Sequence, residues 1–243
     1  MMFDLNEKVA VVIGGGGHLC SAMADGLAKA GAKIAILDIR PHNASKEYPS
    51  FYVDVVKKIS IEAALSQVLQ QYDKVDIVIN GAGINDPSPF LDITLDKWDA
   101  VMDSQITGTM LGCQVFGKHM LENGGGSIIN ISSASAGPPL SKAFAYSVAK
   151  AGIKNLTQNL AREWATSGIR VNAIKPGFFP TEWNRKNFIT PERHEDIIRH
   201  TPMKRYGKPE ELVGCAVWLA SDLASFVTGA EIAVDGGYSC MTI

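Results

Sequence analysis

The chain has 243 residues, of which 46% are hydrophobic and 20% charged, and its formal net charge is −2. A chain of this length can bury a core large enough to fold without disulfides or a bound metal, so we expect one globular domain over residues 1–243. The nearly balanced charge, with no block of like charges, argues against nucleic acid and acidic membranes as partners.

The four cysteines are scattered, form no CxxC pair and have no histidine at metal-ligand spacing beside them. We therefore expect reduced thiols and no metal site. The N-terminus lacks the basic start and apolar run of a signal peptide, and no apolar stretch has the length of a membrane span. These features favour the cytoplasm.

Apolar runs of strand length alternate with segments of helical periodicity along the whole chain. Strands are predicted at 8–13, 33–37, 51–53, 75–79, 127–131, 169–174 and 230–234. Helices are predicted from the glycine-rich turn up to Gly31 and at 59–72, 95–121 (with Thr94 as N-cap), 144–167 and 209–220. The segment between 38 and 51 is too short for a full crossover helix, so only a turn or two of helix is expected there.

The predicted strands are continuous runs of Val and Ile, which indicates that helices cover both faces of the sheet. The sequence therefore predicts an α/β fold, with a single doubly wound, Rossmann-type parallel sheet of about seven strands. Ligands bind beyond the carboxyl ends of the strands in such sheets. Glycine and polar residues gather at this edge, directly after the predicted strands: Gly14 to Gly17, Asp38, Asp54, Asn80 to Gly83, Ser132, Ser133, Pro176 and Gly177.

Four consecutive glycines before a helix let the backbone approach a pyrophosphate, and the helix N-terminus favours its negative charge. By itself the run is equally well explained as a flexible turn. Asp38, 24 residues after Gly14, is placed to accept hydrogen bonds from an adenosine ribose and to repel a 2′-phosphate. We therefore expect NAD as the cofactor, with NADP less favoured, although Arg40 would soften this preference if its side chain turned toward the ribose.

Tyr146 and Lys150 are four residues apart on a predicted helix and share one of its faces. A tyrosine hydroxyl has a pKa near ~10, and a nearby ammonium lowers this pKa and favours the phenolate that acts as a base. A lone Tyr/Lys pair is most often a solvated surface pair. Ser133, 13 residues upstream of Tyr146 at a strand end, can hydrogen-bond the reacting oxygen and favours a catalytic centre.

The chain resembles the short-chain dehydrogenase/reductase family over essentially its whole length. The resemblance rests on Tyr146-Ser147-Val148-Ala149-Lys150, Ser133 in Ile129-Asn130-Ile131-Ser132-Ser133, Asn80-Gly81-Ala82-Gly83, Asp54-Val55, Arg170-Val171-Asn172 before Pro176-Gly177, and Val234-Asp235-Gly236-Gly237. It implies that Tyr146 is the general acid/base and that Ser133 polarises the substrate oxygen. Lys150 would bind the nicotinamide ribose and tune Tyr146.

The resemblance also implies a cofactor site and a homo-oligomer. Asp54 would lie near the adenine, Asn80 and Gly83 along the cofactor, and the segment after Pro176 near the carboxamide, with Thr181 contacting that group. The remaining cofactor-binding residues would be Gly14, Gly16, Gly17, His18, Leu19, Asp38, Ile39, Val55, Ala82, Gly177 and Phe179. Ser135 is expected at the substrate, and a tetramer is expected on the helices at 95–121 and 144–167.

The glycine-rich stretch departs from the family pattern of Thr-Gly, three residues, Gly, any residue, Gly. The matching positions here are Ile13-Gly14, Gly15-Gly16-Gly17, His18, Leu19 and Cys20, so the last two glycines are replaced. Gly17 can supply the tight turn one position earlier, and Cys20 adds a side chain where a helix packs close to the sheet. His18 either projects toward the pyrophosphate or is an exposed loop histidine.

A second departure is Gln105, which stands where the family places an asparagine seven residues after a tryptophan such as Trp98. That asparagine helps to hold a water in the proton relay to the lysine. The glutamine is one methylene longer and can replace the asparagine, displace the water or only pack. We expect activity to survive.

Within the family, the chain is most similar to the sugar-acid branch of D-mannonate oxidoreductases and gluconate dehydrogenases. The shared features are the glycine-rich loop followed by Leu19, Gln114-Val115-Phe116-Gly117-Lys118, Pro176-Gly177-Phe178-Phe179 and Asn184-Arg185-Lys186. The segment 178–205 is expected to form a substrate lid. In this lid Arg185 can bind a carboxylate through two hydrogen bonds, and Asn184, beside Trp183, can form hydrogen bonds with hydroxyls. Alternatively, Arg185 and Lys186 are solvated surface charges.

Two other functions are compatible with these residues. A reductase of ketoacyl thioesters or other carbonyls would share the catalytic groups but act without a substrate carboxylate. A scaffold protein with a degraded dinucleotide site would explain the lost glycines and Gln105, but it would have no need for Ser133, Tyr146 and Lys150. We therefore expect an NAD(H)-dependent oxidoreductase that interconverts a secondary alcohol and a ketone, on a sugar acid or polyol.

Overall fold

The computed structural model describes residues 3–44, 47–138, 140–181, 185–186 and 189–241. Its centre is a seven-stranded sheet in the order β3-β2-β1-β4-β5-β6-β7, and all neighbouring strands are parallel. The strands are β1 Val9–Ile13, β2 Lys33–Asp38, β3 Ser50–Tyr52, β4 Ile77–Asn80, β5 Gly126–Ile131, β6 Ile169–Pro176 and β7 Glu231–Val234. The predicted doubly wound sheet is confirmed, with the strand order reversing between β1 and β4.

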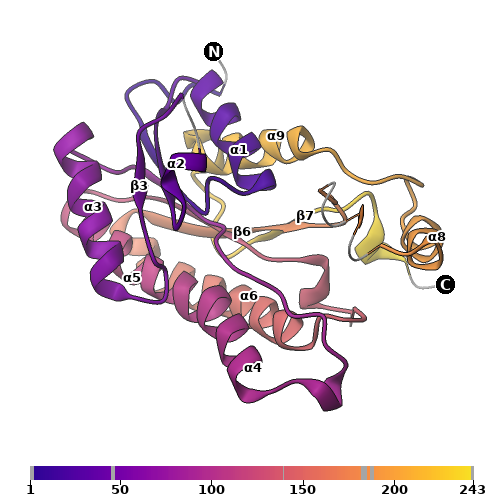
Figure 1. Ribbon diagram of the computed structural model, residues 1–243. Helices are drawn as coiled ribbons and strands as arrows, with labels where there is room; N and C mark the ends of the chain where they lie inside the picture. The colour runs from indigo at the N-terminus through magenta and orange to yellow at the C-terminus, as the bar shows by residue number, and fades with distance from the viewer. Residues whose placement is uncertain (1–2, 45–46, 139, 182–184, 187–188, 242–243) are drawn as a thin grey trace.

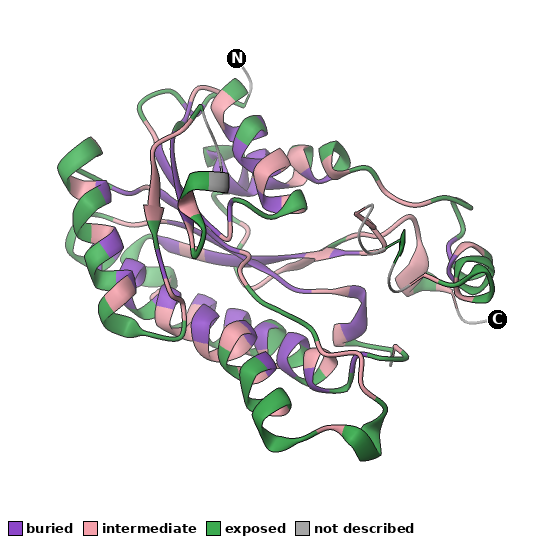
Figure 2. Ribbon diagram, viewed as in Figure 1, coloured by how far each residue is buried: buried purple, intermediate pink, exposed green. Residues whose placement is uncertain are grey.

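Successive residues of each strand supply two separate cores, because side chains alternate between the faces of a sheet. In β1, Ala10 and Val12 pack under α1 (His18–Lys29) and α9 (Val213–Ala220). Val11 and Ile13 pack on the other face, under α3 (Lys58–Tyr72), α5 (Gly108–Glu122) and α6 (Phe144–Trp164). Figure 1 shows these two helical layers. The strands between them are mostly buried, whereas the outer faces of α3 and α4 (Leu95–Met102) are exposed (Figure 2).

The short link between β2 and β3 holds only α2 (Pro41–Ala44), as its length predicts. The long helix predicted at 95–121 is continuous but irregular: α4 (Leu95–Met102) passes through a π-helical turn, Asp103–Thr107, into α5. Thr94 is its N-cap and accepts a hydrogen bond from the Lys97 N–H at 3.3 Å. Single π-turns often occur at functional sites, and this one contains Gln105.

The segment expected to form a lid contains a helix that periodicity did not predict, α8 (Pro191–His200). Thr190 caps it by accepting from the Arg193 N–H at 3.2 Å, and Pro191 occupies its first turn. The remaining short 3₁₀ turns are Phe90–Asp92, Ala134–Ala136, Ala165–Ser167, Pro209–Leu212, Asp222–Ala224 and Tyr238–Cys240. Within the described part of the chain, no helix combines the length and the apolar character needed to cross a membrane.

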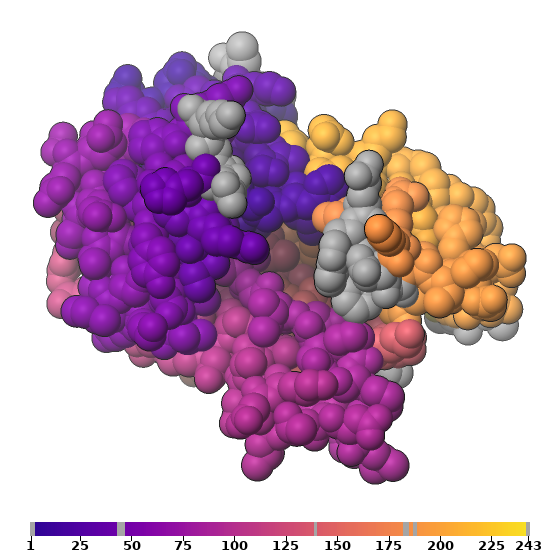
Figure 3. Space-filling view, in the orientation of Figure 1, coloured from indigo at the N-terminus to yellow at the C-terminus, as the bar shows by residue number. Residues whose placement is uncertain are grey.

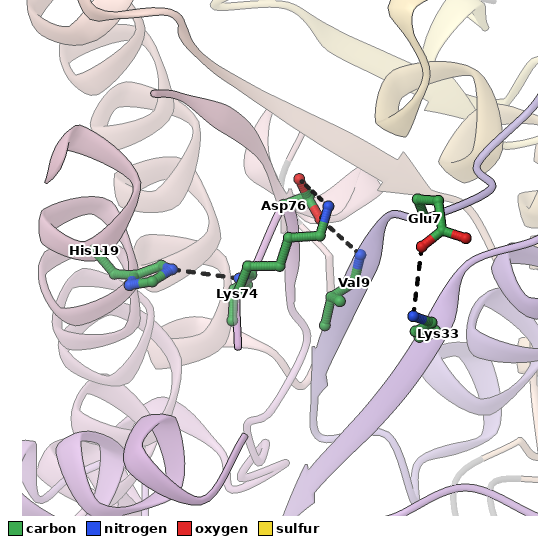
Figure 4. Close-up of polar contacts among 7 residues, drawn as sticks. Glu7, Val9, Lys33, Lys74, Asp76 and His119 are labelled. Atoms are coloured by element: carbon green, nitrogen blue, oxygen red, sulfur yellow. Dashed lines mark hydrogen bonds and ion pairs between the residues drawn. The ribbon is translucent and has the colours of Figure 1, made fainter. Parts of the chain in front are cut away.

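The amino ends of the strands carry structural contacts (Figure 4). The Asp76 carboxylate accepts from the Val9 N–H at 2.8 Å and pairs with the Lys74 ammonium at 3.1 Å. The His119 ring accepts from the Val75 N–H through Nε2 at 3.3 Å. These bonds hold β1, β4 and α5 together at the edge that faces away from the glycine-rich loop.

Candidate active site

The carboxyl ends of the strands surround a cleft of about 530 Å³. Predicted cofactor-binding residues from four segments line it: Gly14, Gly16, Gly17, Asp38, Ile39, Asp54, Val55, Ala82 and Gly83. The structure thus brings together residues from the ends of β1, β2 and β4 and from the segment after β3. A cleft of this volume is within the range of small-molecule sites.

The glycine-rich loop leaves the floor of the cleft bare of side chains. Gly14 has a φ of +79°, and a Cβ at this position would lie 2.7 Å from the Ala82 nitrogen, so both conformation and space require glycine. Gly17 is the N-cap of α1 and offers no side-chain acceptor to the helix N–H groups. The loop therefore suits a diphosphate at the start of α1.

Asp38 is fixed by two backbone donors. Its Oδ2 accepts from the Gly16 N–H at 3.0 Å and its Oδ1 from the Arg40 N–H at 3.0 Å. A carboxylate has about four acceptor sites, so this orientation leaves sites that ribose hydroxyls can use. The negative charge lies beside the loop expected to hold the phosphates, and the Arg40 side chain lines the same cleft.

Cys20 stands at the last glycine position of the family pattern, and its side chain fits into the buried space between α1 and the sheet. The thiol is buried, and a Cβ on Gly81 would lie 2.2 Å from its Sγ. The space above Gly81 therefore accommodates the Cys20 side chain. Burial raises the pKa of this thiol to about 12, which keeps it protonated. His18 is exposed at the first position of α1, and Leu19 packs partly buried against the core instead of lining the cleft.

Ser133, Tyr146 and Lys150 are placed by β5 and α6. Ser133 follows β5, while Tyr146 and Lys150 lie one turn apart on α6. The Lys150 Nζ is 5.4 Å from the centroid of the Tyr146 ring and donates to the Ile131 carbonyl at 2.5 Å. Lys150 is only 4% exposed, so its ammonium lies inside the protein beside the tyrosine.

Ser135 belongs to this cluster. It is 2% exposed, and both its N–H (3.2 Å) and its hydroxyl (3.1 Å) donate to the Ser133 Oγ. In the structure these polar groups of Ser135 are directed at Ser133, and its contact with the substrate stays a prediction. A serine hydroxyl has one proton and two lone pairs. With both lone pairs occupied, the Ser133 proton is available to an oxygen in the site.

Burial governs the protonation of both α6 groups. It raises the pKa of Tyr146, and the hydrogen bond with Ser133 only partly offsets this. It lowers the pKa of Lys150 to about 8, against the opposing effect of Cys20. The sequence predicts that Lys150 lowers the pKa of Tyr146. In the structure, desolvation of the phenol outweighs every other influence on it.

Gln105 acts as a packing residue in the π-turn. Its side chain is 4% exposed, and its Nε2 donates to the Ile84 carbonyl at 2.9 Å. A Cβ on Gly83 would lie 2.3 Å from the Gln105 Cδ, so the amide rests directly on that glycine. These contacts pack the glutamine against the loop after β4 that lines the cleft, and its part in a proton relay stays a prediction.

Asn80 belongs to a chain of buried hydrogen bonds beneath the site. It is buried, and its Nδ2 donates to the Asn130 Oδ1 at 2.9 Å. Asn130 in turn donates to the Thr157 Oγ1 at 3.0 Å. This chain of hydrogen bonds joins β4, β5 and α6, and therefore fixes the helix that carries Tyr146 relative to the sheet. Asn80 is not among the residues that line the cofactor cleft.

A second cavity, of about 810 Å³, adjoins the cleft at Arg40 and Ile84. Its walls come from the segment after β6, which includes the predicted residues Gly177 and Phe179, and from α8, the loop after β4 and the loop before α6. Figure 3 shows the surface recessed between the magenta and purple half of the chain and the orange segment that contains α8. Lys142 and Arg193 line it and were not predicted from the sequence.

The structure describes only some of the residues predicted in the lid. Trp183 and Asn184 lie outside the described residues. Arg185 is exposed, and its guanidinium stacks 4.9 Å above the Tyr206 ring rather than lining the cavity. Thr181 is partly exposed, and Pro176 is buried at the end of β6. The Thr190-Pro191 pair that begins α8 is the sequence signal that would have drawn attention to Arg193.

No group of three or more His, Cys, Asp and Glu side chains in the described ranges is arranged to hold a metal ion. The cleft does fit a dinucleotide. Its bare glycine floor faces the N-terminus of α1, and a fixed carboxylate stands at the end of β2. Gly14, Gly16 and Gly17 would hold the phosphates and Asp38 the adenosine ribose.

Comparison with known proteins agrees with this geometry. The family model described as enoyl-(acyl carrier protein) reductase matches residues 19–239. The NAD-dependent glycerol dehydrogenase of Listeria innocua is 37% identical over 98% of this chain and 96% of its own length. Both similarities include α6 and the segment after β6, whereas the family model begins after the glycine run.

Two solved structures extend the similarity to three dimensions. A gluconate 5-dehydrogenase from Burkholderia cenocepacia, in complex with NADP and tartrate, has a TM-score of 0.94 and 30% identity over 99% of this chain and 98% of its own. A candidate D-mannonate oxidoreductase from Haemophilus influenza, with bound NAD, has a TM-score of 0.91 and 35% identity over 98% and 97% of the two chains.

Proposed function

Because the chain belongs to the short-chain dehydrogenase/reductase family, we propose that it oxidises a secondary hydroxyl of a sugar acid or polyol, with NAD as the hydride acceptor. It is a dehydrogenase of the family's alcohol-oxidising kind. The observation that carries the proposal is the cluster of Ser133, Tyr146 and Lys150 at the end of β5 and on α6. A cleft that fits a dinucleotide at the strand ends and a second cavity lined by cations support it.

The proposed reaction breaks the C–H and O–H bonds of one carbinol and forms a ketone. NAD, when bound, accepts the hydride from carbon. The Tyr146 hydroxyl, as phenolate, takes the proton from the substrate oxygen, and Ser133 donates a hydrogen bond to that oxygen. The buried Lys150 ammonium lies close enough to favour the phenolate once the site holds its ligands. In the direction of reduction the same groups return the proton to the oxygen.

The preference for NAD is proposed from Asp38. Its carboxylate is held beside Gly16, where a 2′-phosphate would meet a fixed negative charge. Among the similar structures, that of the candidate mannonate oxidoreductase holds NAD and that of the gluconate 5-dehydrogenase holds NADP. Titration with NADH and NADPH, followed by fluorescence transfer from tryptophan to the nicotinamide, tests this proposal. Tight NADH and weak NADPH binding supports it, and the reverse order overturns it.

The sugar-acid class is favoured by the charge of the second cavity. Arg40, Lys142 and Arg193 line it, and none of the described lining residues is acidic. A reductase of neutral carbonyls would gain nothing from this arrangement. A screen of NAD with hexonates, polyols and hydroxy esters tests the class, with Tyr146→Phe as the inactive control. Turnover of hydroxy esters alone would favour the carbonyl reductase instead.

We further propose a homo-oligomer, a tetramer by family resemblance, acting in the cytoplasm. Leu91 is 94% and Leu95 78% exposed, and Phe90 packs on Phe144 at 5.2 Å between ring centroids. Leu95 and Phe144 begin the long helices expected at the interface, and Phe90 and Leu91 lie in the turn just before the first of these helices. The four described cysteines are free thiols, which suits a reducing compartment. Light scattering on the eluting protein tests the assembly, and Leu95→Asp should shift it toward smaller species.

A further inference from the structure

We propose that Lys142 and Arg193 are specificity-determining residues that bind the carboxylate of an anionic substrate in the second cavity. The inference rests on the proposed function, because it names how that same site selects its substrate. It replaces the expectation that Arg185 performs this task. Arg185 is exposed and stacked on Tyr206, whereas Lys142 and Arg193 both line the cavity.

Arg193 is held in place across the mouth of the cavity. Its Nη1 donates to the Ser141 Oγ at 2.6 Å and its Nη2 to the Ser141 carbonyl at 3.2 Å. These bonds join α8 to the loop that precedes α6. A guanidinium carries five N–H donors in a rigid plane, so the two bonds to Ser141 orient the group and leave donors for a ligand.

Lys142 follows Ser141 in the loop before α6, and its backbone is fixed as well. Its φ of +60° is a left-handed conformation that side chains rarely adopt, and its carbonyl accepts from the Asn85 Nδ2 at 3.3 Å. Asn85 also lines the cavity. Lys142 is four residues before Tyr146, so a carboxylate held between Lys142 and Arg193 would leave the rest of a small substrate near the catalytic hydroxyl.

Neither of these two side chains has a counter-charge among the described residues, because no carboxylate there lies within ion-pair distance of Lys142 or Arg193. Elsewhere, Lys154 and Lys175 pair with Glu231, and Arg205 pairs with Glu211. Arg40 lines the same cavity and takes part in no ion pair across the described ranges either. Cations without counter-charges around one cavity make a site for an anion.

The test compares acids with their uncharged counterparts. With saturating NAD, steady-state kinetics are measured on D-gluconate and D-mannonate and on the hexitols D-sorbitol and D-mannitol. For Arg193→Gln and Lys142→Gln we expect the KM for the hexonates to rise about 10- to 100-fold, as for loss of a hydrogen bond to a charged group, with kcat nearly unchanged. The KM for the hexitols should change less than about 3-fold, because they carry no charge to lose.

Arg199→Gln is the matched control. Arg199 lies on α8 like Arg193, but it is exposed and bonded to Asp196 at 2.8 Å. It should behave as wild type on every substrate. Arg193→Lys keeps the positive charge but loses the planar guanidinium with its paired donors. Its KM for the hexonates should therefore lie between the values of the wild type and of Arg193→Gln. Thermal melting of each variant establishes that it folds.

A second measurement needs no variant. On the wild-type enzyme, the KM for a hexonate should rise as NaCl is raised from 0.05 to 0.5 M, while that for a hexitol should stay constant, because salt screens only the charged substrate. Calorimetry of tartrate binding to the NADH-loaded enzyme gives a readout without turnover. The affinity should fall about 10-fold or more in Arg193→Gln and stay unchanged in Arg199→Gln.

The outcomes separate this inference from the proposed function. Hexonate turnover with an unchanged KM in Arg193→Gln and Lys142→Gln overturns the inference and leaves the proposed function standing. Turnover of hexitols but not hexonates by the wild type also overturns the inference and restricts the function to polyols. A rise in KM that is equal for hexonates and hexitols shows a structural effect on the cavity and counts against a carboxylate site.

Discussion

The Ser135 hydroxyl donates a hydrogen bond to the Ser133 Oγ over 3.1 Å, and the Ser135 N–H donates to the same oxygen. Ser135 is buried and does not line the second cavity. Ser133 can therefore direct its own proton only outward, toward Tyr146 or a substrate oxygen. We therefore propose that Ser135 is a positioning residue that acts on the reaction through Ser133.

Ser135→Ala should lower kcat about 3- to 10-fold with little change in KM, since one neutral hydrogen bond contributes about 1 kcal/mol. The backbone N–H of residue 135 still donates to Ser133 in this variant. Ser133→Ala should cost far more, because it removes the group that contacts the substrate oxygen. A fall in kcat for Ser135→Ala as large as that for Ser133→Ala would show that Ser135 contacts the substrate itself.

Asp38→Asn should raise the ratio of kcat/KM for NADP to that for NAD, by about 10-fold or more, because it removes a like charge from the 2′-phosphate position. Arg40→Ala in the Asp38→Asn background should reverse part of this gain, since the Arg40 side chain lines the same cleft. Initial rates with both cofactors at one substrate concentration measure the ratio. An unchanged ratio in Asp38→Asn would place the adenosine ribose elsewhere.

The buried charge of Lys150 lowers the stability of the folded protein. Burial lowers its pKa from 10.5 to about 8. Between these values the unfolded chain binds a proton that the folded chain does not, so the free energy of unfolding rises with pH across this window. Lys150→Met should therefore be inactive, yet more stable than wild type at pH 7, by roughly 1–3 kcal/mol.

The gain in stability from Lys150→Met should shrink as the pH rises from 8 toward 10, where wild-type Lys150 becomes neutral without cost. Denaturation by urea at several pH values measures it. Lys154→Met is a control, because Lys154 is half exposed and paired with Glu231. A stability difference that does not depend on pH would show that packing, and not the buried charge, separates Lys150→Met from wild type.

Gln105→Asn should destabilise the protein by about 1–2 kcal/mol, because the shorter amide loses the Ile84 carbonyl and leaves a gap over Gly83. The KM for NAD should rise a few-fold, since this loop lines the cleft, while kcat stays within about 3-fold. Thermal unfolding and NAD saturation curves measure both effects. A large increase in kcat would instead show that the asparagine relay is impaired in the native protein.

His119 makes stability depend on pH at the opposite edge of the sheet. Its Nε2 must be unprotonated to accept from the Val75 N–H, and burial lowers its pKa below 6.5. The contribution is therefore complete above about pH 6.5 and is lost as the pH falls through the lowered pKa, because the unfolded chain takes up the proton first. The free energy of unfolding of His119→Gln should therefore depend less on pH between 7.5 and 5 than that of the wild type. If the free energy of unfolding changed equally with pH in the two proteins, this assignment would be contradicted.

Much of the fold could be predicted because its signals are local. The Val and Ile runs of β1 and β5, the glycines before α1 and the cap at Thr94 each depend on neighbouring residues in the chain. The π-turn around Gln105 and the helix α8 were not predicted. An extra residue in one helical turn shifts the apolar pattern by a single position, which a short stretch of sequence does not distinguish from ordinary variation, and α8 buries only Ile197.

The parallel sheet, the edge expected to bind the ligands and the residue types at that edge follow from local sequence patterns, because parallel strands place all their carboxyl ends together. The directions of the Ser135, Gln105, Arg185 and Arg193 side chains do not follow from these patterns and are seen only in the folded protein. Arg193 meets Ser141 from 52 residues away in the chain. The direction of a long polar side chain depends on the partners that folding brings next to it. Composition and spacing in the sequence do not predict which partners these are.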